Sequence, residues 1–120
     1  MVSEVFKKAY GVYDPNSVVN FISSEDEMEG DNVAHYQSVG VGAIDIILSQ
    51  LFGSKLAAVN NILDLPCGHG RVLRHLRSAF PDAKIDACDL SFDGVDFCSK
   101  NFDAFPIYSS KNLTEVEFPQ

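Results

Sequence analysis

The chain has no long apolar run, few basic residues and only three cysteines, and each shortage argues against a class of protein. A membrane-spanning helix needs roughly 18 consecutive apolar residues. The longest candidate, VGVGAIDIILSQLF, is shorter and contains Asp45 and Gln50. The first residues, MVSEVFKK, have neither the apolar core of a secretion signal nor the arginine-rich character of a transit peptide. We therefore expect a cytoplasmic protein with no membrane partner.

Basic residues are outnumbered, since 9 Lys and Arg face 17 Asp and Glu and give a formal net charge of −8. Nucleic-acid phosphates are bound by clustered Lys and Arg, so the composition argues against a nucleic-acid partner. The densest acidic run, residues 25–31, lacks the ligand spacing of a calcium loop, and we predict a solvated loop there. The 46% hydrophobic content of the 120 residues is typical of one globular domain.

The three cysteines, Cys67, Cys88 and Cys98, form no C-x-x-C pair, and their odd number favours free thiols in a reducing compartment. A zinc site built on Cys67 and His69 would have only two local ligands, so we predict no metal. Cys67 could also be a nucleophile with His69 as its base, but a small buried turn residue is the preferred interpretation.

Residues 1–59 are predicted to form a helical segment. Ser3 is a candidate cap for a first short helix. Asp14 followed by Pro15 predicts a second helix, because proline lacks the N–H that the first helical turn leaves unpaired. The apolar residues expected to follow in this second helix are Val18, Val19, Phe21 and Ile22.

A longer helix is predicted within residues 32–53, where Gly53 is a natural C-terminal stop. Gly40 and Gly42 each weaken its first turns by roughly 1 kcal/mol relative to alanine, which points to close packing. The apolar residues at helical spacing are Val39, Ala43, Ile46, Ile47 and Leu51.

Residues 60–120 alternate between strand and helix patterns. NILDL, AKIDACDL and FPIYSS are strand candidates, and helical patterns separate them. Such alternation implies right-handed crossovers and a parallel sheet. The fold class is therefore α/β, a Rossmann-like doubly wound sheet that this chain carries through about three strands.

The two helices between these strands have different predicted faces. In the first, an apolar face is expected to point inward and a polar face of Arg71, Arg74, His75 and Arg77 outward into solvent. The apolar face comprises Val72, Leu73, Leu76, Ala79 and Phe80. In the second helix, Ser91 is the predicted cap, and the predicted inner face comprises Phe92, Val95, Cys98 and Phe102.

Chemistry-bearing residues gather where the predicted strands end. Asp64 ends the first strand, and Gly68 and Gly70 follow in a turn where absent side chains let a ligand approach the backbone. Asp89 ends the second strand, 19 residues after Gly70, a spacing at which an acid can accept hydrogen bonds from ribose hydroxyls. Together these features predict a nucleotide or nucleoside site at the carboxyl ends of the strands. Asp64 could instead cap the turn through local backbone bonds.

The turn does not match a dinucleotide fingerprint. That fingerprint is G-x-G-x-x-G, whereas here Gly68-x-Gly70 is followed by Arg71, Val72 and Leu73, so the third glycine is missing. Asp64 would also repel a pyrophosphate, whereas it suits a cationic ligand end. An NAD-dependent oxidoreductase fragment is therefore a weaker alternative.

ILDLPCGHGRVLRHL resembles the first motif of the class I S-adenosylmethionine-dependent methyltransferases, and IDACDLS resembles their second. The resemblance implies that Asp64 lies near the amino-acid end of S-adenosyl-L-methionine and that Asp89 holds its ribose. The turn from Pro66 to Gly70, including Cys67, would pass beneath the cofactor. Leu90 would flank the adenine, and Tyr36 would cover the methionine part unless it anchors the N-terminal helices instead.

The chain departs from this family in two ways. Pro66 replaces the first glycine of the motif and removes one N–H donor. The family fold has seven strands, so the resemblance implies an N-terminal portion, and an open third strand could pair with another copy of the chain. A non-catalytic interaction module is therefore a further alternative. The methyl acceptor and any catalytic base stay unknown.

Overall fold

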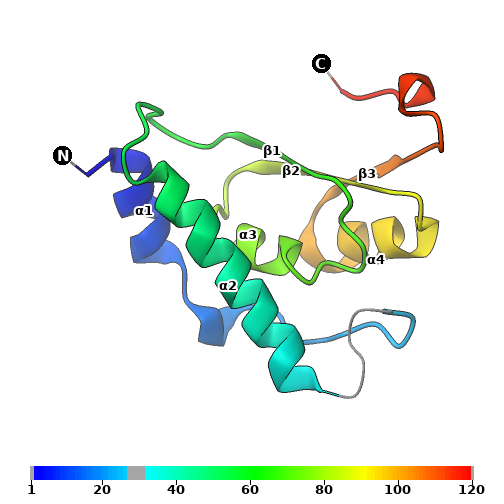
Figure 1. Cartoon of the computed structure of the whole chain (residues 1–120), viewed down its shortest axis with the longest axis horizontal. Coiled ribbons are helices and arrows are strands. Elements are labelled where there is room, and N and C mark those ends of the chain that lie inside the picture. Colours follow the sequence, from blue (N-terminus) through cyan, green and yellow to red (C-terminus); the bar gives the residue numbers. More distant parts are fainter. Residues whose placement is uncertain (1, 27–31, 120) are drawn as a thin grey trace.

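The computed structural model describes residues 2–26 and 32–119, which form a mixed α/β fold of four helices and a three-stranded parallel sheet (Figure 1). Glu27, Glu29 and Asp31 of the predicted solvated loop lie outside the described residues. The elements in chain order are α1 (Glu4–Val12), the 3₁₀ turn η1 (Pro15–Ser17), α2 (Val33–Leu51), β1 (Asn61–Asp64), α3 (Leu73–Ala79), β2 (Lys84–Asp89), α4 (Phe92–Phe102), β3 (Phe105–Tyr108) and the 3₁₀ turn η2 (Leu113–Glu115).

The three predicted strands are confirmed, and they pair in the order β1-β2-β3. Ile62 of β1 lies beside Ile85 of β2, and Ala87 of β2 lies beside Pro106 of β3. Each parallel pair is joined through a helix, because parallel neighbours need a crossover connection. The carboxyl ends of β1 and β2 consequently meet at one edge of the sheet, where the predicted site residues lie.

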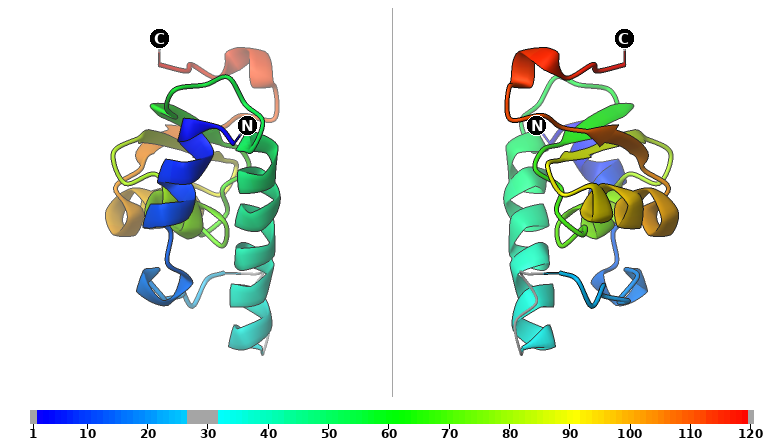
Figure 2. Two further views of the ribbon diagram at one scale, coloured as in Figure 1. Left: turned by 90° about the vertical axis from the view of Figure 1, so that its left-hand side faces the viewer. Right: turned by 90° about the vertical axis from the view of Figure 1, so that its right-hand side faces the viewer.

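The four helices lie on one side of the sheet (Figures 1 and 2). The doubly wound arrangement, which needs helices on both faces, is therefore absent from the described part of the chain. Right-handed crossovers that step in one direction along a sheet place their helices on the same face, which accounts for α3 and α4. Leu63 and Phe105, on the other face, are half-exposed. None of the described helices is long and apolar enough to cross a membrane.

One hydrophobic core joins the N-terminal helices to the sheet. Ala9 of α1 and Leu48 of α2 are buried in the same cluster as Leu73 of α3 and Ile85 of β2. Ser3 caps α1 as predicted, since its hydroxyl accepts a hydrogen bond from the Phe6 N–H at 3.2 Å. The predicted segments 1–59 and 60–120 thus share their apolar interior.

The predicted helix after Asp14 is wrong beyond its first turn. The Asp14 carboxylate caps Pro15–Ser17, but the chain then leaves the helical path. The carbonyls of Val19 and Phe21 accept hydrogen bonds from the Arg74 guanidinium, at 3.2 and 2.9 Å. A tertiary donor therefore takes carbonyls that a helix would have paired with its own N–H groups.

Helix α2 forms as predicted, and the predicted face is confirmed in part, because Ile47 and Leu51 pack against the core from partly buried positions. Its buried residues follow an i, i+4 row, and Ile46 of the predicted face is 66% exposed. Gly40 sits at the centre of the row, against the His75 ring and the Arg71 carbonyl, whereas Gly42 has no neighbours where a side chain would be. The missing side chain of Gly40 lets this row pack closely against His75. The buried row comprises Tyr36, Gly40, Ile44 and Leu48.

His75, predicted to be a surface residue, is 1% exposed. Its Nδ1 lies 2.9 Å from the Tyr13 hydroxyl, and its ring fills the space beside Gly40. Burial, followed by the nearby Arg74 charge, lowers the pKa of His75 to about 4, so the imidazole is neutral near pH 7. The histidine thus joins α1, α2 and α3 as an uncharged packing residue.

Helix α4 begins at the predicted cap, where the Ser91 hydroxyl accepts from the Gly94 N–H at 3.2 Å. One predicted inner residue, Phe92, is instead exposed, and its ring lies edge-on against Tyr108 of β3. The remaining predicted inner residues, Val95, Cys98 and Phe102, are buried.

Alanine substitutions at the two α2 glycines should have opposite effects on stability. Gly40→Ala places a methyl group against the His75 ring and the Arg71 backbone, and it should lower the free energy of unfolding by about 1–3 kcal/mol. Gly42→Ala meets open space and should raise it by up to about 1 kcal/mol through helix propensity. Urea denaturation measures both, and equal effects would contradict the close packing at Gly40.

Candidate functional site

An open hollow of about 410 Å³ lies at the carboxyl ends of β1 and β2. Five of the predicted cofactor-binding residues line it, namely Asp64, Pro66, Cys67, Gly68 and Asp89. His69, within the predicted turn, also lines it, and the remaining lining residues are Asp26, Leu65, Arg71 and Val72. The structure therefore brings the predicted turn and both predicted acids to one concave surface.

Three predicted cofactor contacts do not line this hollow. Gly70 faces the protein interior, because a Cβ there would lie 2.5 Å from the Phe102 ring. Leu90 is 58% exposed beyond the end of β2. Tyr36 is fully buried, and its hydroxyl donates to the Asp26 carboxylate at 2.6 Å. The alternative interpretation of Tyr36, a buried aromatic that anchors the N-terminal segment, agrees with this position.

Both glycines of the turn adopt backbone conformations that side chains disfavour. Gly68 has φ of 53° and Gly70 has φ of 84°, and the Leu65–Pro66 peptide bond is cis. Among the described residues, apart from its two chain neighbours, nothing lies within 4 Å of the position a Gly68 Cβ would occupy, so the backbone there is open to an approaching group. Gly94 of α4 packs against the Gly68 carbonyl, leaving no room for a larger residue.

Asp89 fastens the turn to the end of β2. One of its carboxylate oxygens accepts from the Gly68 N–H at 2.8 Å, and the other accepts from the Ser91 N–H at 2.8 Å. Each carboxylate oxygen can accept a second hydrogen bond, so capacity for a ligand hydroxyl remains. Ribose binding by Asp89 stays a prediction, and its role in shaping the turn is an addition to it.

Asp64 is the most unusual group of the hollow. Its Oδ2 is buried and has no hydrogen-bond partner among the described residues. Burial, followed by repulsion from Asp89, raises the pKa of Asp64 to about 6. If Asp64 instead capped the turn locally, its Oδ2 would be expected to accept a backbone N–H, and none of the described residues donates one to it. A buried carboxylate without a partner is costly, and a cationic group in the hollow would remove that cost.

The surroundings of Cys67 disfavour a nucleophilic thiol in this turn. A hydrogen bond with Cys98, followed by burial, raises the pKa of Cys67 well above its usual range, which suppresses the nucleophilic thiolate. His69 is engaged elsewhere, with its Nε2 2.7 Å from an Asp93 oxygen. The three cysteines are free. The described residues contain no group of three or more His, Cys, Asp or Glu placed to hold a metal ion.

Arg74 supports the hollow from behind, contrary to the solvated position predicted for it. It is 2% exposed, and its Nε donates to the Gly70 carbonyl at 2.8 Å. Its guanidinium also donates to the His69 carbonyl and the Tyr36 hydroxyl, at 3.3 and 3.2 Å. The ring of Phe102 lies 4.9 Å from the guanidinium carbon. Together with the bonds to Val19 and Phe21, these contacts connect the turn to the N-terminal segment and α2.

Sequence reasoning missed Arg74 because a charged residue on a helix is normally assigned to the solvent face. Its position carried a usable signal, since it follows Gly70 by one helical turn and so can reach the carbonyl of that glycine. Arg77 is a second arginine that was predicted to be solvated. It is partly buried, and its nearest carbonyl, that of Ala83, lies at 2.7 Å. Both arginines satisfy backbone carbonyls where turns leave them unpaired.

Asp26 is a further departure from the predicted solvated loop, because its side chain is buried at the edge of the hollow. It accepts from the Tyr36 hydroxyl, and its negative charge favours the charged form of Arg74. Of the two described residues of the acidic run, Glu25 is exposed and Asp26 belongs to the interior.

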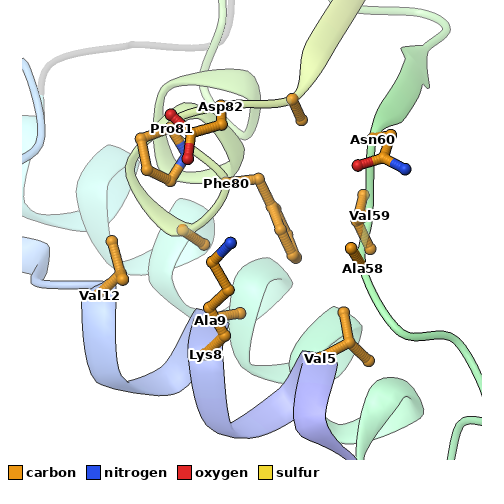
Figure 3. Close-up of a pocket in the computed structure, with 12 residues that line it drawn as sticks. Val5, Lys8, Ala9, Val12, Ala58, Val59, Asn60, Phe80, Pro81 and Asp82 are labelled. Carbon is orange, nitrogen blue, oxygen red and sulfur yellow. The ribbon is translucent and has the colours of Figure 1, made fainter.

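A second cavity lies at the opposite, N-terminal end of the strands, between α1 and α3 (Figure 3). It measures about 60 Å³, and its apolar lining includes Val5, Val59 and Phe80. That volume holds about two water molecules, which is too small for a nucleoside. The hollow beside Asp64 is therefore the better candidate site.

No protein-family model matches this chain, and no significant match is found among curated proteins or solved structures.

Asp64→Asn should stabilise the protein above pH 6. The native state holds the Asp64 proton more tightly than the unfolded state, so wild-type stability falls as pH rises from about 3.8 to about 6. Removing the charge should raise the free energy of unfolding at pH 7.5 by about 1–3 kcal/mol. The gain should vanish below about pH 4, where Asp64 is protonated in both states.

Urea denaturation across this pH range measures the effect. Asp103→Asn is the matched control, because Asp103 is exposed and its φ of 53° is well tolerated by asparagine. A loss of stability in Asp64→Asn at pH 7.5 would show that the Asp64 charge is already compensated within the protein.

Proposed function

We propose that the hollow binds S-adenosyl-L-methionine and that the protein is a methyltransferase, or the cofactor-binding part of one. The carrying observation is the buried Asp64 Oδ2, which lines the hollow and has no hydrogen-bond partner in the part of the chain that the structure describes. The cofactor has an ammonium group and a sulfonium centre, and either would lower the free energy of this carboxylate. A pyrophosphate-containing ligand such as NAD would raise it, so the same observation disfavours the oxidoreductase alternative.

The remaining residues of the hollow suit a nucleoside with a cationic tail. Gly68 leaves its backbone open to close approach, and Asp89 keeps acceptor capacity at the end of β2. The methyl group of a bound sulfonium is electrophilic. The contribution of the chain would be to hold the ligand and orient that methyl group toward an acceptor. The acceptor stays unidentified.

Calorimetric titration with S-adenosylhomocysteine and with NAD tests this proposal. The wild-type chain should bind the first and not the second. Asp64→Asn should weaken binding of S-adenosylhomocysteine at least about tenfold, because a charge-assisted hydrogen bond is lost. Asp103→Asn should bind like wild type.

Asp64→Asn is a sharper variant than Asp89→Ala, because Asp89 also holds the Gly68 N–H and its loss would disturb the turn itself. If Asp64→Asn binds S-adenosylhomocysteine less tightly than wild type but unfolds at a higher urea concentration, Asp64 contributes to ligand binding and not to the stability of the fold. Absence of S-adenosylhomocysteine binding by the wild-type chain would overturn the proposal.

A non-catalytic interaction module is the second candidate, and the helix-free face of the sheet favours it. Leu63 and Phe105 are half-exposed there, in register on either side of Asp86. A second copy of the chain could cover these side chains or extend the sheet through an open edge.

Light scattering after size-exclusion chromatography tests this candidate. Wild type should show a concentration-dependent dimer, and Leu63→Lys should be monomeric because a buried lysine would be desolvated in the interface. Ile46→Lys, on the exposed side of α2, is the matched control. A wild-type monomer at the highest soluble concentration would contradict self-association.

A further inference from the structure

The helix-free face of the sheet carries two opposite charges on its central strand. Asp86 lies in register between Leu63 of β1 and Phe105 of β3, and both of these apolar side chains are half-exposed. Lys84 is two residues earlier in β2, and side chains two positions apart on a strand point to the same face. Its Nζ lies 3.5 Å from the Asp86 Oδ1 and 4.9 Å from the centre of the Phe105 ring. This face therefore combines apolar side chains with an adjacent pair of opposite charges.

The ion pair within the chain leaves the Asp86 carboxylate incompletely satisfied. Its Oδ1 is buried and has no hydrogen-bond partner within residues 2–26 and 32–119, although the Lys84 ammonium is near. The side chain of Lys84 is 46% exposed, whereas that of Asp86 is 15% exposed. An ammonium has three N–H donors, so Lys84 keeps donors for a second acceptor. A buried carboxylate oxygen without a hydrogen bond is costly, and a second donor at this face would remove that cost.

A second copy of the chain can supply that donor. Lys84 and Asp86 are neighbours on one side of one strand, so a two-fold axis that crosses β2 between them places the Lys84 of each copy opposite the Asp86 of the other. The strands of the two copies then run antiparallel. A two-fold axis along β2 would instead bring Asp86 against Asp86, and like charges opposite each other in an interface repel. Charge complementarity thus selects the antiparallel arrangement.

The overall charge of the protein makes such local pairs necessary. A formal net charge of −8 opposes the association of two copies, so a specific interface between them needs contacts of opposite charge. The reciprocal arrangement supplies one such contact on each side of the axis. Leu63 and Phe105 flank Asp86 and would exclude water from each contact, which strengthens the attraction.

We propose that two copies of the chain pack face to face through the helix-free face, with Lys84 of each copy donating to Asp86 of the other. The inference rests on the second candidate function, self-association through this face. It extends that candidate, because it assigns the pairing residues and the relative orientation of the copies. Each Asp86 Oδ1 would receive from the second copy the hydrogen bond that its own chain does not provide. Neither residue lines the hollow beside Asp64, so the interface leaves that hollow open.

Charge reversal tests the pairing. Lys84→Glu places two acids opposite each other at both contacts, and Asp86→Lys places two lysines there. Each variant should therefore dimerise at least about tenfold more weakly than wild type. The double variant Lys84→Glu/Asp86→Lys exchanges the two charges and should regain dimerisation. Light scattering after size-exclusion chromatography, over a range of protein concentrations, measures each dissociation constant.

An equimolar mixture of the two single variants is the decisive sample. In a dimer of one Lys84→Glu chain with one Asp86→Lys chain, each contact joins an acid to a lysine. The mixture should therefore dimerise although neither variant does so alone, whereas a repulsion confined within one chain would not be relieved by mixing. Lys100→Glu is the matched control, because it makes the same charge change at an exposed position of α4, and it should dimerise like wild type. Urea denaturation checks that each variant is folded.

The outcomes distinguish this inference from the candidate function on which it rests. If Leu63→Lys abolishes a wild-type dimer and Lys84→Glu does not weaken it, the reciprocal pairing is overturned and self-association through this face stands. A mixture that stays monomeric while wild type dimerises would also overturn the pairing. If wild type is monomeric at the highest soluble concentration, the second candidate function and the inference both fail, and the methyltransferase proposal is unaffected.

Discussion

The buried guanidinium of Arg74 is the interaction on which the rest of the structure depends. It donates to carbonyls of the glycine turn and of residues that lie 53 and 55 positions earlier in the chain. A desolvated charge is stable only when its donors are satisfied, so turn, N-terminal segment and α2 must all be in place around it. The Tyr36 hydroxyl and the Asp26 carboxylate complete this arrangement. The hollow therefore has a charged support directly behind its backbone.

Local patterns predicted the elements of the sheet well. β1, β2 and β3 each contain a short apolar run bounded by turn residues, and the caps Ser3 and Ser91 accept the expected N–H groups. The positive φ at Gly68 and Gly70 also agrees with the predicted turn. These features depend on residues that are close together in the sequence, so a single sequence was sufficient to predict them.

The features that the sequence did not predict depend on contacts between residues that are far apart in the chain. Residues 18–22 have the apolar character of a helix, yet the carbonyls of Val19 and Phe21 accept hydrogen bonds from Arg74 instead. Residues 71–77 look amphipathic, yet His75 is buried against Gly40 of α2, and Arg74 is buried against Tyr36 and Phe102. Of the candidate site, the turn and both acids could be placed from sequence. The burial of Arg74 behind the turn could not, because it depends on which side chains lie nearby in space.

Gly94 shows how far the determinants of the hollow extend beyond its surface. The residue lies in α4 and does not line the hollow, yet its missing side chain makes room for the Gly68 carbonyl. Any larger residue would push the turn away from the position in which Asp89 holds it. We therefore expect substitutions at position 94 to be tolerated no better than substitutions within the turn itself.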